Sequence, residues 1–178
     1  MFKSIKNNKG FTLIELLAVI VILGILMIVA IPQVTKYIEQ SKKDTFIDTA
    51  KAYINAARYA YLNDEYTDIT GCTLGSNARI PLSKLEVDNA GKSSFGGELD
   101  WYVTIIVRKD DKGAYNDNAI HYTYEYYITI KDQSKKWTIS GPEKSLKRQY
   151  VKQIDDTIAG GTISCGDSIE APTVSTIN

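Results

Sequence analysis

The sequence predicts an α+β fold in which one long amino-terminal helix packs its carboxyl-terminal half on an antiparallel β-meander. Two observations support this class. An apolar run without charge, from Leu16 to Thr35, continues into a segment with helical periodicity, and later segments alternate apolar and polar residues. The chain has 178 residues, and about 145 of them follow the leader and the apolar run, which is enough for one domain.

The apolar run is long enough to cross a bilayer, since about 20 helical residues span roughly 30 Å. Gly24 and Pro32 are its predicted weak points. An interior proline removes one backbone hydrogen bond and clashes with the preceding turn. A simple kink, as in many membrane helices, is one interpretation of this pattern.

The segment from Lys36 to Leu62 continues the helix without glycine or proline. Its apolar residues recur at steps of three and four, which is typical of a helix with one buried face. They include Phe46, Ala50, Tyr53, Ala57 and Ala60. Joined to the apolar run, this segment predicts one helix of about 50 residues, or roughly 75 Å.

Residues 63–97 predict a connecting region with one helical turn near Ile80–Leu85, because Asn, Asp, Gly and Ser are frequent there. Three strands follow, at residues 99–108, 120–131 and 137–139, joined by short links into a meander. Leu146, Tyr150, Ile154 and Ile158 then recur every four residues and predict a short second helix near the carboxyl terminus, which ends at Gly160–Gly161.

The first ten residues form a basic leader, with Lys3, Lys6 and Lys9 and no acid. This charge balance is typical of a segment that stays on the cytoplasmic side of a membrane. An ordinary secretory signal would be cleaved beyond the apolar region, for example at Ala30. The length of the run and the acid Glu15 inside it disfavour that reading, and an acid among apolar residues is a functional hypothesis by default.

The hexapeptide Gly10-Phe11-Thr12-Leu13-Ile14-Glu15 resembles the leader junction of type IV prepilins and the related pseudopilins. The resemblance implies that a prepilin peptidase cleaves between Gly10 and Phe11 and that Phe11 is N-methylated. It implies a precursor in the cytoplasmic membrane and assembly into a surface fibre, made of this chain and other pilins by a dedicated machinery. It also implies that the helix around Pro32 can unwind when subunits pack.

These observations divide the chain into four parts. Residues 1–10 are a leader that is removed, residues 11–35 the membrane and fibre-core half of the helix, residues 36–62 its amphipathic half, and residues 63–178 the globular head. In a fibre Glu15 would be surrounded by apolar helices, so its expected partner is the Phe11 amine of an adjacent subunit. The alternative is an ordinary acid in the first turn of a helix.

Cys72 and Cys165 are the two cysteines of the chain. In a domain outside the cytoplasmic membrane such a pair indicates one disulfide, with two unpaired thiols as the alternative. Their spacing, with the single histidine His121, does not suit a metal site, and no cofactor is expected. His121 also has no acid or nucleophile close to it in the sequence, so an enzyme is not expected.

Lysine plus arginine equals aspartate plus glutamate, at 21 each, so the charge gives no reason to expect nucleic acid as a partner. The tyrosines between Tyr122 and Tyr127 could form a glycan or ligand platform, although an alternating tyrosine row is more often core. Two other functions remain open. One is a pseudopilin of a type II secretion or DNA-uptake machine, and the other is a ligand-binding ectodomain on a single-pass membrane anchor.

Overall fold

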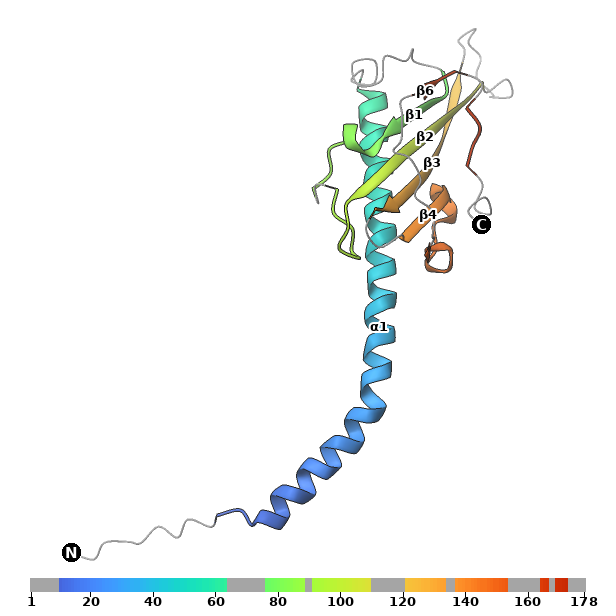
Figure 1. The fold of residues 1–178 in the computed structure, drawn as a ribbon. Helices are drawn as coiled ribbons and strands as arrows, with labels where there is room; N and C mark the ends of the chain where they lie inside the picture. Colours follow the sequence, from blue (N-terminus) through green and yellow to red (C-terminus); the bar gives the residue numbers. More distant parts are fainter. Residues whose placement is uncertain are drawn as a thin grey trace, which may run out of the picture. The chain divides into compact units, whose positions relative to one another are not determined.

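The structure is a computed structural model, and it describes residues 10–63, 76–88, 91–109, 121–133, 137–153, 164–166 and 169–172 (Figure 1). The chain forms two compact units that divide between Gln40 and Ser41. The first unit contains the beginning of the long helix. The second contains the rest of that helix and the whole sheet. From here on, the head means this second unit, which includes residues 41–62 of the helix as well as the predicted head 63–178.

The long helix α1 extends from Leu13 to Leu62, a length of 50 residues. It is continuous through Pro32, so the predicted helix length is confirmed. Within the head its buried residues repeat at helical spacing, as the sequence predicts. They are Phe46, Ile47, Thr49, Ala50, Tyr53, Ile54, Ala57, Ala60 and Tyr61.

The sheet has six strands in the order β5-β4-β3-β2-β1-β6, and every neighbouring pair is antiparallel. The strands are β1 (Ala78–Pro81), β2 (Leu99–Lys109), β3 (Tyr122–Asp132), β4 (Trp137–Pro142), β5 (Lys152–Gln153) and β6 (Ser164–Cys165). The predicted meander is confirmed as β2, β3 and β4. The α+β class, with a long amino-terminal helix packed on an antiparallel sheet, is therefore confirmed.

The core of the head lies between the buried stripe of α1 and one face of the sheet. Val103, Ile105, Ile128, Ile130 and Ile139 from the three meander strands are all fully buried. Aromatic rings extend this core, since Phe95 stacks on Trp137 with ring centroids 4.4 Å apart and meets Phe46 edge-on. The alternation of the strands therefore places their branched side chains against the helix.

Part of the second face of the sheet is also buried, and its buried residues are mostly polar. Thr104, Thr129, Lys131, Thr138 and Ser140 are 5% exposed or less. The hydroxyls of Thr129 and Ser140 lie 2.8 Å apart, and the Thr138 hydroxyl donates to the carbonyl of Ile130. These bonds offset part of the cost of removing polar groups from water.

The connecting region contains more structure than the sequence indicates. Its predicted helical turn is confirmed as the 3₁₀ helix η1, Leu82–Lys84. Strand β1 directly before it was not predicted, because four residues that end in Pro81 are too few to show an alternating pattern. Strand β1 pairs with β2 on one side and with β6 on the other.

The prediction of a second helix from Leu146 is wrong over the described residues 146–153. The chain there forms the 3₁₀ helix η3, Arg148–Tyr150, followed by β5, which pairs with β4. The backbone groups at the free edge of β4 gain partners from β5, and a helix in this segment would leave them without these partners. Leu146 and Val151 supply the buried side chains, a spacing of five that does not match one helix face. Ile154 and Ile158 lie outside the described residues.

Candidate functional site: the start of the long helix

The motif that carries the resemblance lies at the start of α1. Gly10, Phe11 and Thr12 precede the first helical residue, and the Phe11 side chain is 94% exposed. The Thr12 amide and the Thr12 hydroxyl each donate a hydrogen bond of 2.8 Å to Oε2 of Glu15. In return the Glu15 amide donates to the Thr12 hydroxyl oxygen at 3.3 Å.

This reciprocal pair is a capping box, in which the residue before the helix and the third helical residue satisfy each other's backbone groups. The structure therefore gives Glu15 a partner within its own chain, Thr12. Thr12 belongs to the motif, but the motif alone assigns it no role. The signal was present, since a threonine followed three residues later by a glutamate before an apolar run is typical of this cap.

The surface that follows the cap is apolar and uncovered. Every residue from Gly10 to Glu39 is exposed. The helix passes the length and composition criteria for a membrane span, and none of its most apolar window is buried inside the structure. Leucine, isoleucine and valine side chains in water are costly over such an area, so this segment needs lipid or other helices around it.

Gly24 and Pro32 both lie inside this exposed segment. No heavy atom outside the helix's own nearby backbone lies within 4 Å of a Cβ placed on Gly24. The hydroxyl of Thr35, close to Pro32, donates to the carbonyl of Ile31 at 3.0 Å. The helix has no break at either residue, and their role as weak points in a packed assembly stays a prediction.

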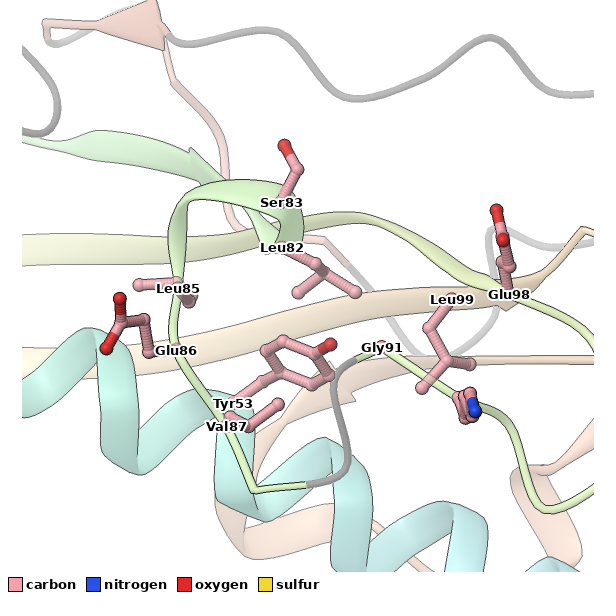
Figure 2. A pocket seen from close by; sticks show the side chains of 10 residues that line it. Tyr53, Leu82, Ser83, Leu85, Glu86, Val87, Gly91, Glu98 and Leu99 are labelled. Carbon is pink, nitrogen blue, oxygen red and sulfur yellow. The ribbon is translucent and has the colours of Figure 1, made fainter.

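The head contains a hollow of about 650 Å³ between α1, η1 and the segment before β2. Tyr53 lies at its centre, with the leucine side chains of the lining around its ring, whereas Ser83, Glu86 and Glu98 point outward (Figure 2). Gly91 borders this hollow with φ of +77°, and a Cβ there would lie 3.5 Å from the Tyr53 hydroxyl. The part of the wall around Tyr53 is therefore apolar, whereas the rest of the lining carries charges of both signs, including Lys92.

The other residues singled out in the sequence are His121 and the two cysteines. His121 is half-buried directly before β3. Cys165 lies in β6, whereas Cys72 lies outside the described residues, so the predicted bridge between them stays a prediction. Among the described residues there is no group of three or more histidine, cysteine, aspartate or glutamate side chains that could hold a metal ion.

Comparison with known proteins agrees with the motif. Residues 5–31 match the family model described as the prokaryotic N-terminal methylation motif. Fimbrial protein Q of Moraxella bovis is 32% identical over 119 residues, which cover 60% of this chain and 76% of that protein. The chain belongs to the family of type IV pilins and pseudopilins.

Other members of the family match shorter parts of the chain. The type IV major pilin protein PilA of Myxococcus xanthus is 40% identical over 63 residues, 35% of this chain and 29% of that pilin. The ComG operon protein 3 homolog of Bacillus licheniformis is 42% identical over 53 residues, 28% of this chain and 55% of that protein. No solved structure matches.

Membership of the pilin and pseudopilin family has two consequences. The prepilin motif and the apolar start of α1 indicate a membrane-anchored precursor. The family also indicates assembly with other pilins into polymers. The Moraxella relative is named as a fimbrial protein and the Myxococcus relative as a pilin, both structural proteins by name.

Proposed function

We propose that this chain is a structural subunit of a type IV pilus. A prepilin peptidase removes residues 1–10 and methylates the new amino-terminal residue Phe11. The mature subunit then leaves the cytoplasmic membrane through the pilus assembly machinery and joins a helical fibre at the cell surface. The alternative within the family is a pseudopilin of a secretion or DNA-uptake machine, to which the similarity with the ComG protein points.

The observation that carries this proposal is the uncovered apolar half of α1 directly after the capped Glu15. Lipid covers this surface before assembly, and the same surfaces of other subunits cover it in the fibre. Transfer from lipid to a helix bundle keeps apolar groups among apolar groups. Burial of apolar surface therefore contributes little to the free energy of assembly. The subunits must instead be held together by close packing of side chains and by polar pairs.

Glu15 supplies such a polar pair. Thr12 holds the carboxylate through two hydrogen bonds that both end on Oε2. Cleavage creates a cationic amine on Phe11, four residues before Glu15, since an α-amine has a pKa of about 7.7–8.0. In the fibre the amine of an adjacent subunit pairs with this carboxylate, because both charges would otherwise be buried without compensation.

Processing is tested first, by intact mass and amino-terminal sequencing of the protein from cells that express it. The expected mature chain begins at Phe11 with a methylated amine. A chain that keeps Met1, or that begins at Ile31, would contradict the proposal. The first outcome would indicate a plain anchor and the second an ordinary secretory signal.

Assembly is tested with Glu15→Ala and Glu15→Lys, each expressed as the only pilin of the cell. Fibre yield should fall sharply with alanine and further with lysine, which places two cations together, while membrane insertion and head folding persist. Glu39→Lys, a matched change at an exposed acid of α1 outside the apolar run, serves as the control. Normal surface fibres from Glu15→Lys would exclude this pairing as the basis of assembly.

The two candidates within the family are separated by the product of assembly. A pilus subunit yields long fibres that can be sheared from the cell surface and contain this chain as their main component. A pseudopilin yields short fibres that remain within the envelope, and its deletion abolishes secretion or DNA uptake. Electron microscopy and mass spectrometry of the sheared fraction distinguish the two.

A further inference from the structure

A second hollow of the head lies where the sheet narrows. Strand β4 ends at Pro142, which pairs with Tyr127, whereas β3 extends back to Tyr122. After Pro142 the chain turns into the 3₁₀ helix η2, Glu143–Ser145. Between this turn, β3 and α1 is a hollow of about 370 Å³, within the usual size range of small-ligand sites.

The guanidinium of Arg58 is fixed at the wall of this hollow. It donates to the Glu143 carboxylate at 2.5 Å and to the Asn55 side-chain oxygen at 2.7 Å, and it lies 4.7 Å from the centroid of the Tyr126 ring. The side chains of Arg58 and Glu143 each remain 33% exposed. Three partners therefore hold Arg58 in place while part of it stays accessible, as in a preorganised binding group.

The rest of the lining adds further polar groups and aromatic rings. The Glu125 carboxylate accepts from the Tyr127 hydroxyl at 3.1 Å and from Arg108 at 3.0 Å. Lys144 is exposed on the turn. The charged residues of the lining are balanced, with Arg58 and Lys144 against Glu125 and Glu143.

This balance decides which ligands the hollow suits. A lining without net charge gives no electrostatic preference for an anion or a cation. Fixed guanidinium donors, carboxylate acceptors and tyrosine rings match a ligand that has both hydroxyl groups and apolar ring faces. We propose that the hollow between Arg58, Tyr127 and Glu143 binds a neutral saccharide unit.

An added peptide strand suits this place less well. The hollow follows β3 from Tyr124 to Tyr127 only, and Pro142, Glu143 and Lys144 form its other wall. A strand paired along β3 would need a longer groove, since each residue advances about 3.3 Å. The proposal is independent of whether the chain forms a pilus or a shorter fibre.

The experiment uses the full chain in phospholipid nanodiscs, because alkyl maltoside detergents would themselves present neutral sugars. The probes are immobilised neutral oligosaccharides of hexose and N-acetylhexosamine, with sialylated and sulfated oligosaccharides and an extended threonine–valine peptide alongside. The variants are Arg58→Lys, which keeps the charge but removes the planar fork, and Lys144→Ala. Lys84→Ala on η1 is the matched control, since Lys84 is also exposed on a 3₁₀ helix.

The expected result is binding to at least one neutral oligosaccharide, weakened about tenfold or more by Arg58→Lys and Lys144→Ala, in line with the loss of hydrogen bonds to charged groups. Lys84→Ala should bind as the unchanged protein does. Absence of binding to any neutral oligosaccharide, preference for acidic ones, or equal binding by all variants would overturn the proposal. Selective binding of the peptide would also overturn it. Lys144→Ala keeps the test valid if Arg58→Lys impairs folding.

Discussion

The two halves of α1 show opposite relations between sequence and burial. From Gly10 to Glu39 the residues are nearly all apolar up to Val34, and every one is exposed. From Phe46 to Tyr61 charged and apolar residues alternate with helical period, and most of the apolar ones form one buried stripe, although Tyr59 is exposed. The sheet of the same chain therefore covers the apolar side chains of the less apolar half. The more apolar half needs lipid or other chains to cover its apolar side chains.

The strongest test of this contrast is removal of the first half. A fragment from Lys36 to Asn178 should be soluble and monomeric, because the surface that requires lipid or partners is gone. The full chain should need detergent or nanodiscs to stay in solution. Analytical ultracentrifugation of both forms provides the measurement, and large oligomers of the fragment alone would place the assembly surface in the head.

Two matched substitutions, one in each half of α1, compare how much the halves contribute to the free energy of unfolding of the head. Ile54 is fully buried and Ile20 is 58% exposed. Ile54→Ala should lower the free energy of unfolding of the head by about 2–5 kcal/mol through the cavity that it leaves. Ile20→Ala should change it by less than about 0.5 kcal/mol.

Urea unfolding of the full chain in nanodiscs measures both variants. Tryptophan fluorescence reports on the head alone, because both tryptophans, Trp101 and Trp137, lie in the sheet. Equal destabilisation by the two variants would show that the first half of α1 also stabilises the head.

The capping box predicts a smaller and more local effect. Thr12→Ala should destabilise the first turn of α1 by about 0.5–2 kcal/mol, since it removes the threonine side chain from the cap. Hydrogen exchange of the Glu15 amide in nanodiscs should accelerate accordingly. Thr35→Ala, which loses only the bond to the Ile31 carbonyl, should leave the Glu15 amide unchanged. An unaltered Glu15 exchange rate in Thr12→Ala would contradict the cap.

The smallest expected effect concerns pH and the lower part of the head. Arg148 donates two hydrogen bonds to the Asp44 carboxylate, and these bonds hold the pKa of Asp44 below its ordinary value of 3.8. The pair therefore stabilises the head fully above the unfolded pKa, and this contribution is lost as the pH falls through the lower pKa of the folded state.

Thermal unfolding of the unchanged protein and Asp44→Asn between pH 7 and strongly acidic pH tests this linkage. The difference in melting temperature between the two should shrink as the pH falls below the ordinary aspartate pKa of 3.8. A constant difference across the range would show that the ion pair contributes nothing that depends on the charge of Asp44.

Sequence patterns predicted the elements that are long enough to repeat a period. The 50 residues of α1 and the 11 residues of both β2 and β3 gave clear signals. The strands β1, β5 and β6 have two to four residues each, and their pairing depends on neighbours far away in the sequence. The second helix was wrongly predicted for the same reason. Residues 152–153 pair with the edge of β4, and this long-range pairing outweighs the local four-residue repeat.

The site shows a similar division. The motif from Gly10 to Glu15 could be recognised in the sequence because its residues are consecutive. The same six residues contain the pattern of the Thr12–Glu15 cap, so the cap could also have been predicted. The hollow beside Arg58 was not, because α1, β3 and the turn after β4 meet only in the folded head. The burial of Lys131, which is 3% exposed on the second face of the sheet, could not be predicted either, because a lysine in a strand is normally expected at the surface.

The position of β6 has a consequence for the order of events in the cell. Strand β6 pairs Ser164 and Cys165 with Arg79 and Ala78, across about half of the chain. The carbonyl of Glu170 accepts a further bond from Arg79, and Ile169 is buried nearby in the sequence. The six strands therefore cannot all pair until Ser164 and Cys165 have left the ribosome, more than 80 residues after the strand that they join. Synthesis of the earlier strands alone leaves that edge of β1 without its partner.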